Sequence, residues 1–206
     1  MTEPTSHWDG VYTNNAATNL SWYEPLPTIS LAPVKELASA STAPVIDIGS
    51  GASQLGDQLL SDGFSDVTLL DLSRHALEEV RMRLGERADD VDFVGHDVVT
   101  WEPSRHYEVW HDRAVFHFLT DDAARDQYLE VATSGVRIGG SLVLATFAEN
   151  GPSRCAGLPV TRYSAEALTR IFSSSFAFVK EMREEHVTPA GVVQPFTWVV
   201  LRRDHR

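Results

Sequence analysis

A glycine turn between an apolar run and a helical stretch is the part of the sequence best suited to hold a ligand. Val45–Ile48 is a short apolar run, and Gly49, Ser50 and Gly51 follow it directly. Glycines let the backbone pass close to a ligand, and the first turn of the next helix presents N–H groups without a partner inside the helix. This segment therefore predicts a cofactor-binding loop.

Acidic residues at the ends of three apolar runs indicate which kind of cofactor the loop binds. Asp47 stands two positions before the first glycine, which suits a ligand with an ammonium group rather than phosphates. Asp71 ends the second run, 20 residues after Gly51, where a carboxylate can accept hydrogen bonds from both hydroxyls of a ribose. Asp97 follows the third run, where it can accept from an adenine amino group. Its alternative role is that of a solvated loop aspartate.

The glycine spacing separates this loop from a dinucleotide-binding loop. The pattern Gly-x-Gly-x-x-Gly would place its third glycine at Gln54, where a long polar side chain obstructs a pyrophosphate. An NAD(P)-dependent reductase is therefore disfavoured, but it stays as an alternative function. A non-catalytic binding module of the same fold is a further alternative. Taken alone, the segment is also compatible with an ordinary strand-to-helix turn.

Short apolar runs alternate with helical stretches of roughly 10 to 15 residues, which is typical of βαβ units and a mainly parallel sheet. Near the end of the chain, strands around Phe176–Glu181 and Phe196–Leu201 are joined by a turn at Thr188–Gly191, so these two strands must be antiparallel. The other expected strands lie at Ala43–Ile48, Val67–Asp71, Val91–Val94, Glu108–His111 and Ser141–Phe147. Helices are expected over Leu31–Ala40 with Ser30 as the cap, over Ala52–Asp62, after Ser73, and after Asp121 or Asp122.

The N-terminal segment shows neither a helical nor a strand period and predicts an irregular arm. It holds several aromatic residues among polar ones, and Trp22 is the residue we expect to fold over a cofactor and exclude water. The alternative is a hydrophobic strap packed on the edge of the sheet. We therefore divide the chain into an aromatic arm or lid, residues 1–29, and a single domain, residues 30–206.

The bulk composition is that of an ordinary globular domain, with 206 residues, 43% of them hydrophobic and 22% charged. A net charge of -12 with scattered Lys and Arg predicts that nucleic acid is not a partner. The only cysteine, Cys155, cannot form an internal disulfide, and neither a secretory signal nor an apolar stretch of about 18 residues is present. We therefore expect a cytoplasmic protein without a membrane partner, whose oligomeric state is left open.

The glycine loop and the two acidic residues after it resemble those of the class I S-adenosylmethionine-dependent methyltransferases, over about Ser30 to Arg203. The resemblance implies an α/β fold with one Rossmann-like sheet of seven strands, order 3-2-1-4-5-7-6 with strand 7 antiparallel, and helices on both faces. It implies S-adenosyl-L-methionine as the cofactor and a small-molecule or protein side-chain acceptor. One departure is Ser53, where many members have a third glycine. The expected donor-binding residues are Trp22, Asp47, Gly49, Ser50, Gly51, Asp71, Leu72, Asp97, Val98 and His111.

The segment after the fourth expected strand holds the catalytic candidates. Asp112-Arg113-Ala114 is similar to the Asp-Arg-Gly or Asp-Lys-Gly segment of the thiopurine methyltransferase-like branch and of some protein-lysine methyltransferases. His111 is expected to contact the methionine part of the cofactor or to act as a general base, and Arg113 is the second catalytic candidate. The alternative for His111 is a histidine hydrogen-bonded in the core. The apolar residues around His117 favour a structural role for this histidine.

The long connection Asn150–Tyr163 after the fifth expected strand predicts an acceptor-side loop. Cys155, Tyr163 and, near the final turn, His186 are its substrate-side candidates, although Cys155 has the alternative role of a small buried apolar residue. No metal is expected, because the histidines and the cysteine form no close pair such as His-x-x-x-His. Whether O, N or S is methylated is left open.

Overall fold

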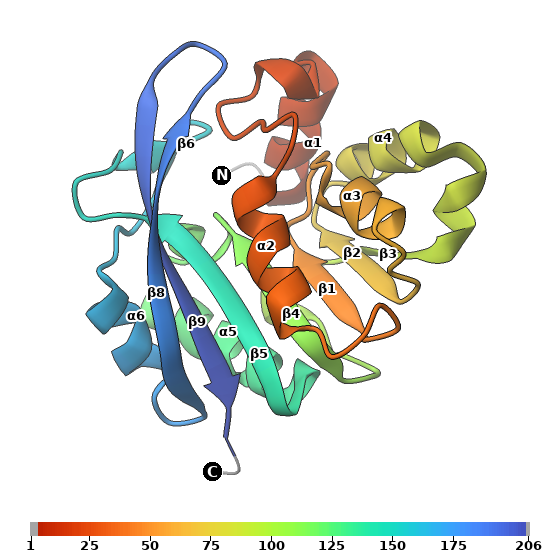
Figure 1. Ribbon diagram of the computed structural model, residues 1–206. Helices are drawn as coiled ribbons and strands as arrows, with labels where there is room; N and C mark the ends of the chain where they lie inside the picture. The colour runs from red at the N-terminus through yellow and green to blue at the C-terminus, as the bar shows by residue number, and fades with distance from the viewer. Residues whose placement is uncertain (1–3, 205–206) are drawn as a thin grey trace.

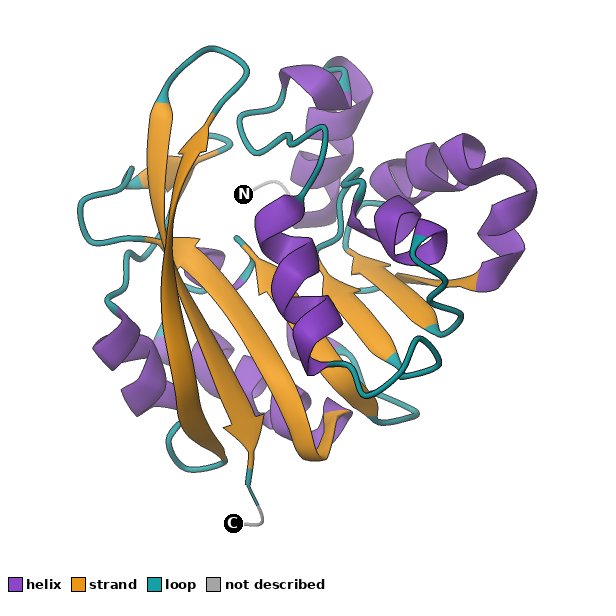
Figure 2. Ribbon diagram, viewed as in Figure 1, coloured by secondary structure: helices purple, strands orange, loops and turns teal. Residues whose placement is uncertain are grey.

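A mixed sheet of seven strands forms the centre of the structure, with helices on both of its faces (Figures 1 and 2). This computed structural model describes residues 4–204, so the expectations for residues 1–3 and 205–206 lie outside it. The strand order is β3-β2-β1-β4-β5-β9-β8, which is the expected order once β8 and β9 are counted as the sixth and seventh strands. The strands are β1 Val45–Ile48, β2 Val67–Asp71, β3 Val91–Gly95, β4 Tyr107–Arg113, β5 Val136–Phe147, β8 Phe176–Val187 and β9 Val193–Arg203.

Parallel pairing of β1 with both β2 and β4 brings three carboxyl ends to the same edge of the sheet. The chain runs from β1 toward β3 on one side and from β4 toward β8 on the other, so β1 and β4 flank the topological switch point. Ligands of open α/β sheets bind in the crevice beyond the strands at this point. In the β1–β4 register, Asp47 lies opposite His111.

Five α-helices form the layers on the two faces of the sheet. In Figure 1, α2, α3 and α4 lie in front of the sheet, and α5 and α6 lie behind it. Helix α1 and the short helix η1 lie at the top, above the carboxyl ends of β1 and β2. The helices are α1 Pro4–Asn14, α2 Thr28–Leu37, α3 Leu55–Ser61, α4 Arg74–Leu84, α5 Asp122–Gly135 and α6 Ala165–Phe172, with short helices η1 Ala17–Asn19, η2 Gly85–Asp90, η3 Val98–Thr100 and η4 Phe116–Phe118. None of the helices within residues 4–204 is long and apolar enough to cross a membrane.

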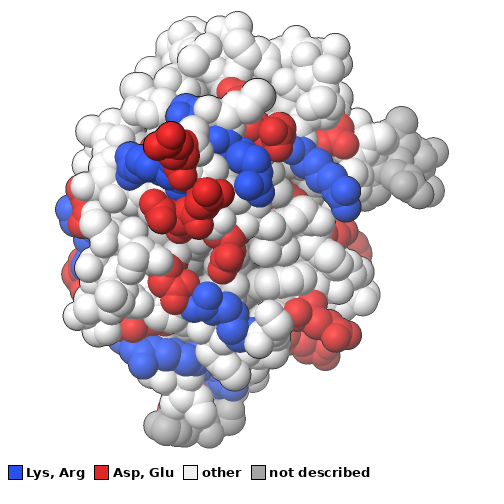
Figure 3. Space-filling view, turned by 90° about the vertical axis from the view of Figure 1, so that its right-hand side faces the viewer, with Lys and Arg blue, Asp and Glu red and all other residues white. Residues whose placement is uncertain are grey.

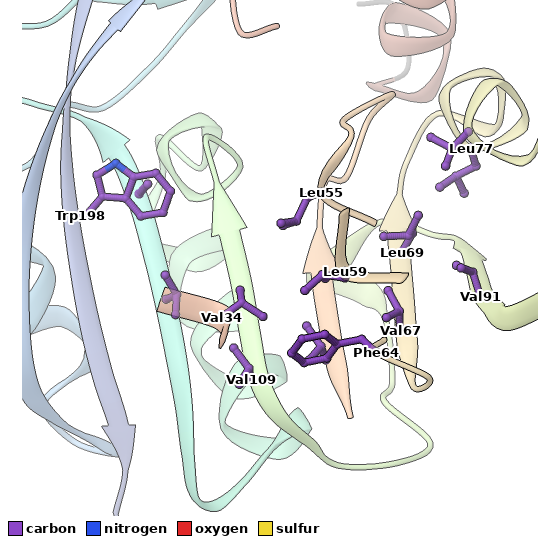
Figure 4. Packing of buried hydrophobic residues seen from close by; sticks show 14 of the residues in the cluster. Val34, Leu55, Leu59, Phe64, Val67, Leu69, Leu77, Val91, Val109 and Trp198 are labelled. Atoms are coloured by element: carbon purple, nitrogen blue, oxygen red, sulfur yellow. The ribbon is translucent and has the colours of Figure 1, made fainter. Parts of the chain in front are cut away.

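Alternate residues of the strands pack into two hydrophobic cores, because successive side chains of a strand point to opposite faces. Val45 and Val109 belong to the core under α2, α3 and α4, part of which Figure 4 shows. Ile46 and Trp110 belong to the core on the opposite face, under α5 and α6. The same alternation decides which polar residues at the strand ends can share a site.

Helix α1 corrects the expectation that the N-terminal segment is irregular over its whole length. Trp8 and Tyr12 are four residues apart and therefore lie on one face of α1. The sequence of α1 is mostly polar and contains Gly10, so its helicity depends on packing of these two side chains rather than on propensity. Helix α2 also begins at Thr28, after Pro27, so Ser30 is a buried residue inside the helix and not its cap.

Strand lengths are the other difference from expectation. The final hairpin pairs β8 with β9 from Phe176–Arg203 to Val187–Val193, which extends both strands beyond the expected limits. The turn between them is as expected, since the Gly191 N–H donates to the Thr188 carbonyl. Strands β6 Arg154–Cys155 and β7 Leu158–Pro159 form a small separate sheet within the long connection after β5.

The surface over β3 and its neighbouring helices carries charges of both signs. In Figure 3, Lys and Arg side chains lie between Asp and Glu side chains and do not merge into one basic patch on this face. Several of them are paired, as Arg83 is with Asp57 and Arg105 is with Asp66. This face therefore gives no support to a polyphosphate-binding surface.

Candidate active site

A cavity of about 320 Å³ lies at the carboxyl ends of β1, β2 and β4, under the N-terminal arm. Its walls come from three parts of the chain. The β-strand ends contribute Asp47, Ile48, Gly49, Ser50, Asp71, Leu72, Asp97 and Val98. The arm contributes Trp8, Tyr12, Leu20, Trp22, Tyr23 and Glu24, and the opposite side is formed by His111, Arg113, Phe118, Phe147, Cys155, Gln194 and Phe196.

Asp71 fastens the glycine loop to the start of α4. The Gly51 N–H donates to one carboxylate oxygen of Asp71 at 2.7 Å, and the Ser73 N–H donates to the other at 2.7 Å. Burial raises the pKa of Asp71 to about 6 although both backbone donors lower it, and the charges of Asp47 and Asp9 raise it further. A buried carboxylate held in this way has a fixed direction toward the cavity that it lines.

The raised pKa of Asp71 predicts a pH-dependent affinity for a ligand whose hydroxyls donate to it. The ionised carboxylate is the stronger acceptor, and its pKa in the folded chain lies above the ordinary value, so acidification through pH 6 protonates it. We expect a ribose-containing ligand to bind up to about tenfold more weakly at pH 5 than at pH 7.5. Calorimetric titration with S-adenosylhomocysteine measures this, and affinity independent of pH in this range would refute it.

Two glycines of the loop adopt backbone conformations that other residues rarely reach. Gly49 has φ +60° and Gly51 has φ +52°. A Cβ atom at Gly51 would lie 2.2 Å from the hydroxyl oxygen of Tyr12, so α1 packs directly on the loop. The loop and the helix above it therefore fit each other only because position 51 has no side chain.

Gly51→Ala is expected to lower stability by about 2 kcal/mol or more, because the strained φ adds to the contact with Tyr12. Gly63→Ala is the matched control: Gly63 has φ +87°, yet a Cβ there meets nothing within 4 Å, so only about 1 kcal/mol should be lost. Urea unfolding of both variants, and of Gly51→Ala with Tyr12→Phe, measures the difference. Equal losses in the two alanine variants would show that the Tyr12 contact is unimportant.

His111 and Asp47 form a buried pair among the residues that line the cavity. Nδ1 of His111 lies 2.7 Å from a carboxylate oxygen of Asp47, and the two side chains are 3% and 5% exposed. The imidazole also packs against the indole of Trp198, with ring centroids 5.9 Å apart. Among the described residues, Nε2 of His111 has no hydrogen-bond partner.

Arg113 is the centre of a charged cluster that joins the arm to β4 and β8. Its guanidinium donates to Glu184 at 2.9 Å, lies 3.8 Å from Glu24, and stacks 4.5 Å from the ring centroid of Phe196. Glu184 also accepts from the indole N–H of Trp198 at 2.8 Å. Burial raises the pKa of Glu24, but His186 and Arg113 together outweigh it, so its pKa lies below the usual value.

The donor set of this site fits the ligand that the sequence predicts. Three carboxylates, Asp47, Asp71 and Asp97, line the cavity beside the glycine loop, and the buried Ser50 hydroxyl is without a partner among the described residues. Hydroxyls, an amino group and an ammonium are hydrogen-bond donors, and carboxylates accept from them. No cluster of cationic side chains for phosphates lines this part of the cavity.

Comparison with known proteins supports one family. Residues 45–140 match the model of a methyltransferase domain family. This match contains the glycine loop, all three carboxylates and the whole of β4. The match and the similar structures described next support a class I S-adenosylmethionine-dependent methyltransferase. These findings support a methyltransferase enzyme with S-adenosylmethionine as cofactor.

Similar proteins agree with this assignment at the level of the fold. The structure from work on converting a disulfide bond into a thioacetal group during echinomycin biosynthesis is 20% identical, with a TM-score of 0.77 over 97% of this chain and 93% of that chain. A second similar structure is the 1,6-didemethyltoxoflavin-N1-methyltransferase of Burkholderia thailandensis, bound to 1,6-didemethyltoxoflavin and S-adenosylhomocysteine. It is 22% identical, and its TM-score is 0.67 over 97% of this chain and 84% of that chain.

A curated relative extends over a shorter part of the sequence. The eEF1A lysine and N-terminal methyltransferase of Mus musculus is 22% identical over 150 residues. The alignment covers 69% of this chain but 21% of the mouse protein, so the methyltransferase described here corresponds to about a fifth of that relative.

The structure brings most of the sequence-predicted residues of the methyltransferase into the cavity, but not all. The expectation for Tyr163 is corrected: this residue lies in the core on the opposite face of the sheet, with its ring centroid 5.6 Å from that of Phe116. His186 is another correction, because its Nε2 lies 2.6 Å from the Ser21 carbonyl oxygen and holds the arm, outside the residues that line the cavity. Gly51 contacts Tyr12 and Asp71 rather than lining the cavity.

Cys155 lines the cavity as expected, but its thiol is a weak nucleophile. Burial raises the pKa of the thiol to about 11, although the charge of Arg113 lowers it. The thiolate is the nucleophilic form of cysteine, so this thiol is unreactive near neutral pH. Cys155 lies in β6, opposite Leu158 of β7, and forms part of the cavity wall.

Asp112 faces away from the cavity because it alternates with His111 and Arg113 along β4. It accepts from the Val115 N–H at 2.9 Å and from the Tyr128 hydroxyl at 2.6 Å, and burial raises its pKa to about 6. Ala114 has φ 72°, at the position where the similar methyltransferase segments have glycine. This segment therefore shapes the turn after β4 and does not supply a carboxylate to the site.

Sequence reasoning missed two contributors from α1. Tyr12 lines the cavity and touches the glycine loop. The ring centroid of Trp8 lies 6.0 Å from that of Trp22 and 5.1 Å from that of Phe118. Asp9 accepts from the Ser73 hydroxyl at 2.7 Å, which joins α1 to the cap of α4. The four-residue spacing of Trp8 and Tyr12 was the signal that could have identified this helix face.

His117 is structural, in agreement with the expectation from its apolar neighbours. Burial, with a contribution from the charge of Arg113, lowers its pKa to about 3, so it is neutral at physiological pH. Its ring packs against Phe118 and Phe147. It does not line the cavity.

One group within residues 4–204 offers three possible metal ligands close together, Glu24, Glu184 and His186. The guanidinium of Arg113 already binds Glu184 and lies beside Glu24. A cation in this place would have to displace or oppose that buried positive charge.

Proposed function

We propose that this methyltransferase transfers the methyl group of S-adenosylmethionine to a small-molecule acceptor within the cavity. The observation that carries the proposal is that one partly enclosed cavity extends from Asp71 to Phe196 and is lined on one side by the arm. A volume of about 320 Å³ falls at the lower end of small-molecule sites. A small acceptor can enter such a space completely, whereas an extended peptide needs a groove along the surface.

The proposed donor half is the side of the cavity formed by β1, β2 and β3. Asp71 accepts from the ribose hydroxyls, Asp97 accepts from the adenine amino group, and Leu72 and Val98 form apolar walls beside the adenine. Asp47, Gly49, Ser50 and the backbone near Gly51 hold the methionine part. When bound, the cofactor supplies a methyl group on a sulfonium, which an in-line nucleophile displaces.

The proposed acceptor half is the side formed by the arm, β4 and the β8–β9 hairpin. Its wall is rich in aromatic rings, including Trp22, Phe118, Phe147 and Phe196. These rings favour an apolar, flat acceptor and keep water from the reacting atoms. Arg113 positions the arm through Glu24 and Glu184, and closure of the arm holds the acceptor next to the methyl group.

A protein side chain is the second candidate acceptor. The mouse relative's name refers to a lysine and an N-terminus, and the net charge of -12 suits a cationic partner. One of the two similar structures comes from work on echinomycin biosynthesis, and the other holds 1,6-didemethyltoxoflavin, so both concern small molecules. The arm covers part of the cavity, and this partial cover favours the small-molecule acceptor.

Transfer of a labelled methyl group into size-separated extracts distinguishes the two candidates. The enzyme is incubated with S-adenosylmethionine carrying a ¹⁴C methyl group and either the fraction of a cell extract below about 1 kDa or the protein fraction. We expect label in the small-molecule fraction and none with Asp71→Ala. Label confined to the protein fraction would refute the proposal and support a protein acceptor.

A further inference from the structure

A buried histidine and aspartate pair stands where the donor and acceptor halves of the cavity meet. His111 comes from β4 and Asp47 from β1, and the parallel register places them opposite each other. Both residues line the cavity. The 2.7 Å contact uses Nδ1 of the imidazole, which leaves Nε2 on the far side of the ring from Asp47.

The contact with Asp47 fixes which nitrogen of the neutral imidazole can accept a proton. An ionised carboxylate only accepts hydrogen bonds, so Nδ1 must carry the hydrogen. The lone pair of neutral His111 is then on Nε2, the atom that has no partner among the described residues. A histidine whose tautomer and ring orientation are fixed by a carboxylate is the arrangement by which an imidazole acts as a base.

The charges around the pair favour the protonated imidazole after transfer. Asp47 is in direct contact with the imidazole, and Asp112 follows in sequence on the opposite face of β4. Burial raises the pKa of Asp112, although the charge of His111 lowers it. Arg113 is the nearby positive group, and its guanidinium is engaged by Glu184 and faces Glu24. A proton on Nε2 is therefore balanced by the carboxylate of Asp47.

We propose that Nε2 of His111, oriented by Asp47, removes the proton of a protic acceptor during methyl transfer. This inference rests on the proposed function and adds the class of acceptor: a molecule with a reacting O–H, S–H or N–H group. The acceptor lone pair forms the bond to the methyl carbon, and the carbon–sulfur bond breaks with its electron pair remaining on sulfur. The acceptor proton moves to Nε2 and is later released to water. Thioethers and tertiary amines lack this proton and fall outside the class.

Nuclear magnetic resonance of ¹⁵N-histidine-labelled protein tests the pair without any acceptor. With S-adenosylhomocysteine bound at pH 8, we expect His111 to show a protonated Nδ1 and an unprotonated Nε2, and Asp47→Asn to lose this preference. His106→Asn, which removes an exposed histidine from the same strand region, serves as the control for assignment. A hydrogen on Nε2 of His111 at pH 8 would overturn the proposal, because that atom could then not accept a proton.

Two probe acceptors separate proton removal from a structural role. Phenol keeps its proton near neutral pH, whereas thiophenol is largely ionised at pH 8 and needs no base. We expect His111→Asn to lower kcat with phenol by about 100-fold or more but with thiophenol by only a few-fold, and His106→Asn to change neither. Affinity for S-adenosylhomocysteine should change less than about threefold in His106→Asn, and kcat is measured at saturating S-adenosylmethionine so that a change of donor affinity in His111→Asn does not enter the comparison.

The outcomes distinguish this inference from the proposed function. Equal losses with phenol and thiophenol would overturn the base role and leave His111 as a residue that shapes the cavity. If the wild type methylates neither probe and labels no small molecule of the extract, the proposed function fails. The imidazole resonances still decide whether Nε2 is free to accept a proton.

Discussion

Replacing Asp71 by alanine is expected to weaken the binding of S-adenosylhomocysteine by about 100-fold or more, equivalent to roughly 2.7 kcal/mol. The proposed hydrogen bonds from two ribose hydroxyls are lost, and bonds to a charged acceptor are the stronger ones. The N–H groups of Gly51 and Ser73 also lose the carboxylate that they share at 2.7 Å, so the glycine loop is no longer fastened to α4. Isothermal titration calorimetry at pH 7.5 measures the change.

Asp89→Ala is the matched control for this variant. Asp89 is an exposed aspartate in η2, and its replacement removes the same charge without touching the cavity. Its affinity for S-adenosylhomocysteine should equal that of the wild type. Circular dichroism confirms that Asp71→Ala remains folded. A folded Asp71→Ala that binds within about threefold of the wild type would show that Asp71 does not hold the ribose.

The second large effect is expected on stability. Glu184→Ala should lower the free energy of unfolding by about 3 kcal/mol, because the buried guanidinium of Arg113 keeps only the more distant carboxylate of Glu24. Arg113 is 9% exposed and loses its 2.9 Å contact, and the indole N–H of Trp198 loses its acceptor. The arm, which meets this cluster through Glu24, should become more mobile. Urea unfolding and the fluorescence of the arm tryptophans measure the two effects.

The neighbouring residue offers the control. Glu185→Ala changes an exposed glutamate on the opposite face of β8, and surface replacements of this kind usually alter stability by less than about 0.5 kcal/mol. Glu184→Gln should fall between the two, since it keeps an acceptor for Trp198 but not the charge. If Glu184→Ala and Glu185→Ala unfold at the same urea concentration, the charged cluster does not stabilise the fold.

The sheet could be predicted from the sequence because its strands are apolar runs followed by glycine or aspartate. Val45–Ile48 and Val67–Asp71 are buried on both faces, so every position is selected for an apolar or a functional side chain. Helix α1 was not predicted, because its residues have weak helical preference and its structure depends on contacts distant in sequence. The lengths of β8 and β9 were underestimated for a similar reason: pairing, not local composition, extends them.

The donor half of the candidate site was predicted better than the acceptor half. Asp47 and Asp71 lie near the ends of β1 and β2, and Asp97 follows β3. The family pattern fixes the order of these strands, so convergence of the three residues on one cavity could be expected. The side chains of Tyr163 and His186 lie where tertiary packing places them, and local sequence does not indicate that position. The period of two along β4 could have separated Asp112 from His111 and Arg113, but the segment was interpreted as one polar group.

A crystal structure with bound S-adenosylhomocysteine is the most direct test of the proposed site. We predict ribose hydroxyls within hydrogen-bond distance of the Asp71 carboxylate, adenine beside Asp97, and the sulfur at the boundary where His111 faces the aromatic acceptor half. S-adenosylhomocysteine bound outside this cavity, or with a ribose that contacts neither oxygen of Asp71, would contradict the assignment of the donor half.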